Sequence, residues 1–137
     1  MADTIAKVDR FSIEVPAKPG EGARVLGSLA AGKADLLAVW GYPLGSSGKV
    51  KIEVVPADTA VFKAAAKAAK IKVKKESAAF CVVGRNKVGA LAEAIGKLGE
   101  KGITIHAAQA IAVGGKYGAL VEVEAKDVRK AARALGV

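Results

Sequence analysis

Few residues in this chain have side chains that could carry out chemistry. His106 is the only histidine and Cys81 the only cysteine. A catalytic thiol needs a neighbouring base, and a metal ion needs a cluster of ligands, so this pair predicts neither. The segment Gly45–Lys49 is similar in composition to a phosphate-binding loop. Its leading glycine is misplaced, however, and its flanks read as two strands instead of a strand and a helix. We therefore expect no enzyme activity, no metal and no cofactor.

Positive charge dominates the ionisable residues. The chain carries 22 Lys and Arg residues against 13 Asp and Glu residues, a formal net charge of +9. Such a charge favours anionic partners, nucleic acid included, although the lysines far outnumber the arginines that suit bidentate phosphate recognition. Lysines at helical spacing are Lys63, Lys67, Lys70 and Lys74. We interpret them as a solvated helix face that runs into a charged strand, with a phosphate-binding stripe as the alternative.

The composition is typical of a folded, soluble chain. Of the 137 residues, 52% are hydrophobic, yet no apolar run approaches the roughly 18 residues of a membrane span. Residues 1–7 lack the apolar stretch of a signal peptide, and a single cysteine excludes an internal disulfide. We expect a cytoplasmic protein without a membrane partner.

An internal repeat organises the sequence. Residues 10–68 recur as residues 79–137 at one constant offset of 69 positions, so that Phe11 corresponds to Phe80. Further matching pairs are Lys18 and Lys87, Gly20 and Gly89, Gly45 and Gly114, Glu53 and Glu122, and Asp58 and Asp127. The alignment needs no insertion. We predict two copies of one small fold, residues 1–75 and 76–137, each so short that docking on the other copy or dimerisation would stabilise it.

Each copy shows the hydrophobic pattern of alternating strands and amphipathic helices. In the first copy, we predict strands at 11–15, 36–40, 50–54 and 71–75, and helices at 23–29 and 57–69. In the second copy, we predict strands at 79–83, 103–108 and 119–124, and helices at 91–98 and 126–135. The order βαββαβ predicts an α+β fold class, with antiparallel sheets and helices on one face, which is the ferredoxin-like arrangement.

The second copy lacks a counterpart to the strand predicted at 71–75. In a ferredoxin-like sheet that last strand covers an edge of the first strand, so the strand at 79–83 needs another neighbour. We expect this neighbour to come from the other copy, from the extension at Thr4–Val8, or from a second chain.

The sequence resembles the ACT domain family. The stretch Lys18–Gly32 (KPGEGARVLGSLAAG) is similar to the turn and first helix of that family, and Lys87–Ile105 (KVGALAEAIGKLGEKGITI) is closer still. The chain departs from the pattern at Ala34–Leu36, at Val88 in place of the turn proline, and in the missing last strand. The resemblance covers nearly the whole chain and implies two ACT-like units in tandem.

The resemblance implies a regulatory, non-catalytic function. ACT domains bind small ligands, most often amino acids, and pass the signal to an attached or partner enzyme. They pair side by side, with the ligand between the turn after the first strand of one domain and the second strand of its neighbour, which implies a homo-oligomer such as a dimer. Carried over by position, the ligand-binding residues are Lys18, Gly20, Asp35, Arg85, Asn86, Gly89 and Thr104. We add His106 as a further candidate contact.

These residue types suit an amino-acid ligand. Glycine lets the backbone approach a ligand, and the N–H groups that begin a helix can receive a carboxylate. Asn86 offers both a donor and an acceptor, while Arg85 or Lys87 would attract a carboxylate. Structural roles are the alternatives. The glycines suit turns, Asn86 suits a helix start, Thr104 suits a strand, and His106 suits a packed or interface position.

Two other functions remain open from the sequence. One is an assembly module of the same fold that binds no ligand. The other is a basic RNA-binding protein, because RNA-recognition motifs share the βαββαβ order. These motifs need aromatic side chains on the central strands for base stacking, and of those strands here only Phe11 supplies one, on the predicted buried side. Nucleic acid is therefore the less favoured partner.

Overall fold

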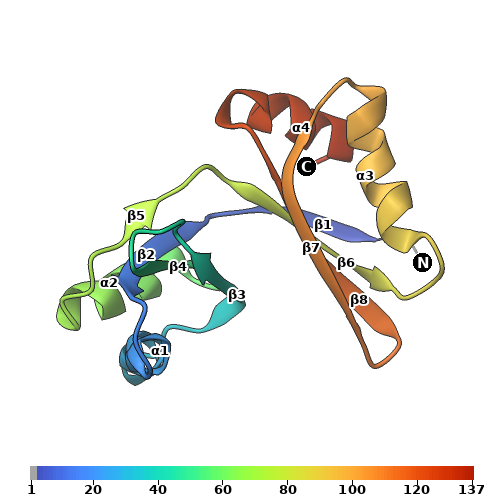
Figure 1. Ribbon diagram of the computed structural model, residues 1–137. Coiled ribbons are helices and arrows are strands. Elements are labelled where there is room, and N and C mark those ends of the chain that lie inside the picture. The colour runs from blue at the N-terminus through green and yellow to red at the C-terminus, as the bar shows by residue number, and fades with distance from the viewer. Residues whose placement is uncertain (1–2) are drawn as a thin grey trace. The chain divides into compact units, whose positions relative to one another are not determined.

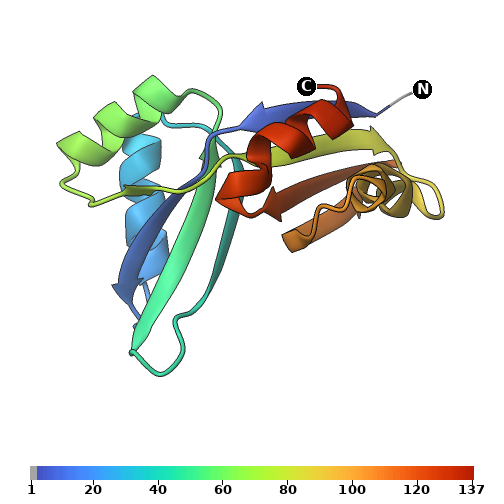
Figure 2. The same ribbon diagram turned by 90° about the horizontal axis from the view of Figure 1, so that it is seen from above.

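The computed structural model describes residues 3–137, which form two compact units. One unit comprises Asp9–Glu76, and the other comprises the residues up to Val8 together with Ser77–Val137. Figures 1 and 2 show the elements of both from two directions. The strands are β1 (Thr4–Val8), β2 (Phe11–Pro16), β3 (Leu36–Pro43), β4 (Lys49–Pro56), β5 (Lys74–Lys75), β6 (Ala79–Arg85), β7 (Ile105–Val113) and β8 (Lys116–Val123). The helices are α1 (Glu21–Ala31), α2 (Thr59–Ala68), α3 (Ala90–Glu100), the 3-10 turn η1 (Ala125–Asp127) and α4 (Val128–Leu135).

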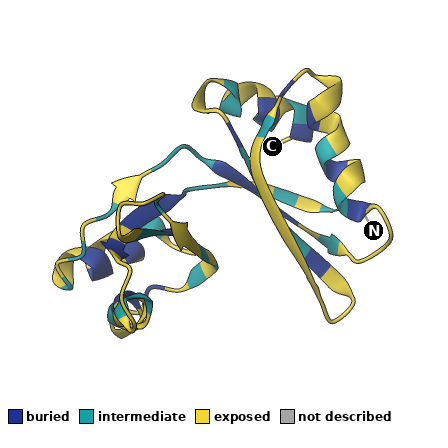
Figure 3. Cartoon of the chain, viewed as in Figure 1, coloured by how far each residue is buried: buried dark blue, intermediate teal, exposed yellow. Residues whose placement is uncertain are grey.

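The unit Asp9–Glu76 is a four-stranded antiparallel sheet with two helices on one face. Its strand order is β3-β4-β2-β5. Alternate residues of β2 and β4 point toward the helices, as the sequence pattern predicts for half-buried strands. Phe11 and Phe62 are fully buried, with ring centroids 4.9 Å apart, and they join the sheet to α2. Figure 3 shows the buried residues along the strands and the inner sides of the helices.

The second unit has the same layers, with strand order β1-β6-β8-β7. Phe80, Leu98 and Val121 form its core together with Ala131 of α4. Strand β1 pairs antiparallel with β6 along its whole length, from Thr4 opposite Val83 to Val8 opposite Ala79. The N-terminal extension therefore supplies the missing edge neighbour, one of the three sources predicted from the sequence.

This pairing places the N-terminal strand differently from the predicted boundaries. The sequence repeat assigns residues 1–75 to the first unit, whereas β1 lies in the sheet of the second unit. The physical reason is that β6 has an edge to cover, whereas the corresponding edge of β2 already has β5 beside it.

The repeat is confirmed for the first strands and corrected for the third. Phe11 and Phe80 occupy equivalent buried positions. Glu53 lies opposite Ser12 of β2, and the equivalent partner of Cys81 in β6 is Leu120. The predicted equivalence of Glu53 with Glu122 is therefore wrong, because β8 is shifted by two positions relative to β4. The connection at 114–115 is shorter than the one at 44–48, and η1 restores the offset before α4.

Backbone irregularities also repeat at the predicted offset. The strand β3 has a bulge between Leu36 and Ala38, and β7 has one between Ile105 and Ala107. The predicted element types are confirmed, with differences at the ends. The strand predicted at 71–75 is reduced to two residues, whereas β7 extends five residues beyond the predicted end at Ala108. No helix among residues 3–137 is long and apolar enough to cross a membrane.

Candidate ligand site at the start of helix α3

A hollow of about 310 Å³ lies beside the first turn of α3 in the second unit. This volume is at the lower end of the roughly 300–1,000 Å³ found for small-molecule sites. It is lined by Asn86, Lys87, Gly89, Ala90, Leu91, Ala92, Ala110, Ile111, Ala112 and Tyr117. The turn after β6 and the first turn of α3 form one wall, and β7 and β8 form the other.

The turn after β6 has a fixed backbone. The amide of Asn86 donates to the carbonyl of Gly115 at 2.9 Å, which holds the turn against the β7–β8 hairpin. Gly89 has a φ of 78°, in the left-handed region that glycine adopts without steric cost, and this bend directs the chain into α3. Within residues 3–137, no side chain caps the N-terminus of α3. The amide of Ala90 donates to the carbonyl of Lys87 at 3.1 Å, and the amide of Glu93 donates to that of Gly89 at 3.0 Å. The amides of Leu91 and Ala92 therefore remain for an external acceptor.

Small residues on β7 make room for the hollow. Ala110 lies opposite Ala119, and Ala112 lies opposite Tyr117. Directly paired residues share a face of the sheet, and Tyr117 and Ala119 pack under α3, so both alanines face the helix side. Larger side chains at these two positions would fill the space.

Two polar side chains line this hollow next to the uncapped helix start. Within residues 3–137, the Asn86 side chain has no hydrogen-bond partner, so its amide can both donate and accept. Lys87 is held by Glu93, with Nζ and Oε2 3.1 Å apart. The helix start and Asn86 can thus receive a carboxylate and a neighbouring polar group, and Leu91 can contact an apolar side chain.

Tyr117 lies at the floor of the hollow. Its hydroxyl donates to Oδ2 of Asp3 at 2.6 Å. Burial, together with the hydrogen bond and the charge of Asp3, raises the pKa of Tyr117 to about 12. The phenol is therefore neutral at physiological pH and remains a donor to Asp3.

The equivalent turn of the first unit has different electrostatics. Gly20 has a φ of 87° and begins α1 without a side-chain cap, as Gly89 does for α3. The first helical residue is Glu21, however, where α3 has Ala90. Glu21 binds Arg24, with Nε and Oε2 2.9 Å apart, and the hydrogen bond from Arg24 holds the pKa of Glu21 below its usual range. The acidic residue in the first turn of α3, Glu93, lies three positions further into the helix, so the carboxylate of Glu21 disfavours an anionic ligand at its helix start more strongly.

The structure brings together only some of the predicted ligand residues. Asn86 and Gly89 line the hollow, whereas Arg85 does not and lies opposite Lys116 in the sheet. Lys18 and Gly20 are exposed at the turn before α1, and the carbonyl of Asp35 accepts the amide of Ala57 at 2.9 Å.

Thr104 and His106 lie at the far end of β7 from the hollow. Thr104 precedes the strand and His106 occupies its bulge, and both are exposed. At about 3.3 Å per strand residue, the stretch from Ile105 to Ile111 spans about 20 Å. One unit therefore cannot supply Asn86 and Thr104 to the same small ligand.

The sequence did not predict the β7 wall or Tyr117. The run Ala107–Val113 does not alternate polar and apolar residues, so the sequence predicts a strand only as far as Ala108. The only signal was the row of alanines itself. Among residues 3–137 no three His, Cys, Asp or Glu side chains form a group that could hold a metal ion. Burial raises the pKa of the Cys81 thiol, which makes it a poorer nucleophile.

Comparison with known proteins gives matches at the level of structure. No known protein family and no curated protein matches the sequence. A crystal structure of a protein from Bacteroides thetaiotaomicron is 19% identical, with a TM-score of 0.81 over 96% of this chain and 88% of that one. The regulatory subunit of aspartate kinase from Thermus thermophilus, in its ligand-free form, is 17% identical, with a TM-score of 0.64 over 99% and 95% of the two chains. The corresponding subunit from Thermus flavus is 15% identical, with a TM-score of 0.65 over the same shares.

These likenesses confirm the predicted fold. The chain has the α+β architecture of these regulatory subunits, with two ferredoxin-like, ACT-like units in tandem.

Proposed function

We propose that this protein is a regulatory module that binds a small amino acid at the start of α3 and has no catalytic activity of its own. The observation that carries the proposal is the hollow of about 310 Å³, in which Asn86 and the uncapped helix N-terminus face the same space. A carboxylate bound at a helix N-terminus gains from the free N–H groups and from the helix dipole.

The rest of the hollow suits the remaining parts of such a ligand. The Asn86 carbonyl oxygen can accept a hydrogen bond from an ammonium group. Leu91 offers apolar contact, and Ala110 and Ala112 of β7 limit the side chain to a small one. An amino acid with a short apolar or polar side chain is therefore the best fit.

A regulatory function is supported by the fold. Two of the structures described above are named as regulatory subunits of aspartate kinase. We infer that this chain transmits ligand binding to a partner enzyme, and that a homodimer is its working form. In such a homodimer, the second unit of one chain would supply Asn86, and the second unit of the other chain would supply Thr104 or His106 to the same ligand.

A panel of amino acids at millimolar concentration tests the binding. A ligand that binds only the folded protein raises stability by RT ln(1 + [L]/Kd), about 2.7 kcal/mol at a hundredfold excess over Kd. We expect one or a few small amino acids to raise the melting temperature. In Asn86→Ala the Kd for such an amino acid should rise at least tenfold, so that a correspondingly higher concentration is needed for the same shift. Lys97→Ala, an exposed change nearer the other end of α3, is the matched control and should leave the effect intact.

An assembly module that binds no ligand is the second candidate. Three exposed apolar side chains of the second unit favour it, namely Val83, Ile111 and Val113, which are 44%, 69% and 68% exposed. If no amino acid changes the melting temperature while the protein self-associates through these residues, the assembly function replaces the binding function.

A further inference from the structure

The strand β5 pairs with the edge of β2 over only two residue pairs, and the segment that precedes β5 does not pair with β2. Lys75 lies opposite Phe11 and Lys74 opposite Ser12, and the pairing ends there. Ile71 and Val73 still pack their side chains against the core. Had the ladder continued, Lys72 would lie opposite Glu14. The segment that leads into β5 thus stays close to the core while its backbone leaves the β2 edge.

The backbone of Glu14 faces the gap that results. The carbonyl of Arg10 accepts the amide of Glu76, at 2.9 Å, on the β5 side of the sheet. In a strand, the N–H and C=O groups of alternate residues point to the same side. Ser12 and Glu14 therefore also present their backbone groups to this side. Ser12 is paired with Lys74, whereas Glu14 has no ladder partner there within the described residues.

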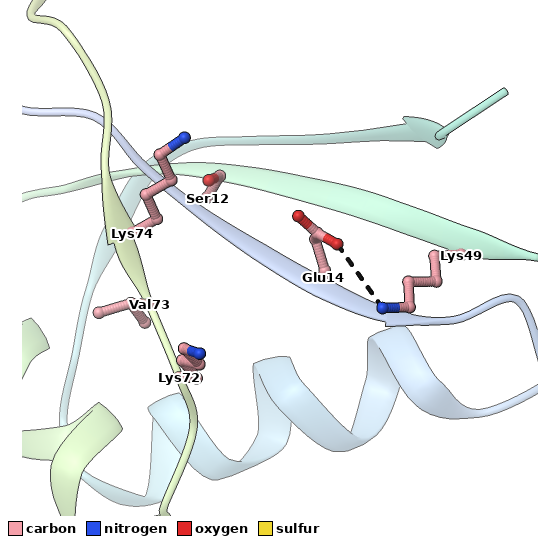
Figure 4. Close-up of a pocket in the computed structure, with 6 residues that line it drawn as sticks. All are labelled: Ser12, Glu14, Lys49, Lys72, Val73 and Lys74. Atoms are coloured by element: carbon pink, nitrogen blue, oxygen red, sulfur yellow. Dashed lines mark ion pairs between the residues drawn. The ribbon is translucent and has the colours of Figure 1, made fainter. Parts of the chain in front are cut away.

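A polar hollow of about 420 Å³ occupies this gap. It is lined by Ser12, Glu14, Lys49, Lys72, Val73 and Lys74. Figure 4 shows Ser12 and Glu14 on β2 beside the segment that carries the lysines, with Lys49 reaching Glu14 from β4. The Nζ of Lys49 and Oε1 of Glu14 are 4.0 Å apart.

Positive charge exceeds negative charge in the lining. Three lysines and one glutamate line it, so the lining carries a net charge of two positive units. Among residues 3–137, Lys72 and Lys74 make no ion pair within 4.0 Å, unlike Lys49.

The nearest other acid is already engaged. Glu76 accepts a hydrogen bond from the Ser12 hydroxyl at 2.9 Å and lies 3.3 Å from Nζ of Lys51. Burial raises the pKa of Glu76, but the hydrogen bonds from Ser12 and Lys51 outweigh this and hold it below its usual range. Glu76 is thus satisfied as a carboxylate by Ser12 and Lys51, and the charge of Lys74 contributes to its lowered pKa from beyond ion-pair distance. Neither Lys72 nor Lys74 has a direct carboxylate contact among residues 3–137, so both ammonium groups can bind an external anion.

We propose that this groove is a second binding site, specific for a small dianion such as a dicarboxylate or a phosphate group. Lys72 and Lys74 bind the charged oxygens, and the amide N–H of Glu14 donates to one of them. Lys49 remains with Glu14 and closes the far end. The site lies in the unit Asp9–Glu76 and shares no residue with the hollow beside α3, so either site can fail its test without the other.

Binding of inorganic phosphate and of succinate tests the proposal, each at constant ionic strength set with potassium chloride. The proposal predicts that one or both raise the melting temperature beyond chloride alone. The response to each probe shows whether phosphate or dicarboxylate is preferred. Lys72→Gln with Lys74→Gln should weaken binding at least tenfold. Lys67→Gln with Lys97→Gln removes the same charge from exposed helix positions and should leave binding unchanged. No response beyond chloride, or an equal loss in both double variants, would overturn the proposal.

Amide NMR spectra of the unaltered protein give a second readout that does not depend on the variants folding. Titration with the preferred anion should shift the amide resonances of Glu14 and Val73 and leave those of Lys67 and Lys97 in place. Shifts spread evenly over the exposed lysines would show general screening of positive charge and would also overturn the site.

Discussion

The hydroxyl of Tyr117 lies 2.6 Å from Oδ2 of Asp3, so a residue of β8 holds the segment that leads into β1. The strand β6 lies between β1 and β8. The Tyr117–Asp3 bond therefore spans the width of three strands and fixes the N-terminal segment to the second unit. It also places a carboxylate next to the floor of the proposed amino-acid site.

Titration of the tyrosines tests this contact. An unperturbed tyrosine has a pKa of about 10, and that of Tyr117 is raised to about 12. Because the folded value is the higher one, the contact stabilises the folded protein fully below pH 10, and this contribution is lost as the pH rises toward 12. The ultraviolet absorbance of tyrosinate should show a late step that Tyr117→Phe removes. If the step persists in Tyr117→Phe, the assignment to Tyr117 is wrong.

Gly84 gives a second test of the same region. A Cβ built at Gly84 would collide with the carboxylate of Asp3 and lie 3.0 Å from the Tyr117 ring. We predict that Gly84→Ala destabilises the protein by about 1–3 kcal/mol, the usual cost of overpacking. Gly118→Ala is the matched control, since Gly118 is also a strand glycine of this sheet but has open space around it. That control should be neutral or slightly stabilising in urea unfolding, and equal losses in both variants would contradict the packing described for Asp3.

The buried ion pair of Arg10 and Glu53 distinguishes the first unit. Arg10 is 7% and Glu53 3% exposed, and the Tyr42 hydroxyl also donates to Glu53 at 2.5 Å. Breaking a buried pair from one side costs about 3–5 kcal/mol, whereas replacing both partners by apolar residues is often neutral. We predict a loss of this size for Glu53→Gln and recovery of most of it in Arg10→Met with Glu53→Leu.

Leu120 is the reason to expect that recovery. It takes the place of Glu53 in the second unit, so the fold accepts an apolar residue at this position. Glu21→Gln serves as the control, because the pair that Glu21 forms with Arg24 is exposed to solvent, which screens the charges, so its loss should change stability far less. A double variant as unstable as Glu53→Gln alone would show that the charge itself is needed.

The sequence predicted the fold where local patterns and the repeat agreed. Alternating apolar residues located the first strands, and the match of Phe11 with Phe80 fixed their equivalence. The error at Glu53 and Glu122 has a simple cause. A shorter hairpin and the extra turn η1 compensate each other, so an ungapped alignment restores its offset and hides the shift.

The candidate site could be predicted only in part. Asn86 and Gly89 belong to a local turn that the sequence itself marks. The opposite wall depends on pairing between β7 and β8, which brings Ala110 and Tyr117 beside the turn from distant positions. The groove at Glu14 was missed for a related reason, because Ile71–Lys75 alternates like a full strand while its backbone leaves the ladder early.

The most direct test of amino-acid binding uses one position at the start of α3. Ala92 is exposed, lines the hollow, and lies in the first turn, where an acidic residue favours the helix dipole. Ala92→Glu should therefore fold at least as stably as the unaltered protein while repelling a carboxylate, and Ala92→Gln has a side chain of the same size without the charge. Calorimetric titration with the best amino acid of the panel should show affinity retained within about threefold in Ala92→Gln and reduced at least tenfold in Ala92→Glu, a difference of about 1.4 kcal/mol or more. Equal affinity in the two variants would contradict binding of a carboxylate at this helix start.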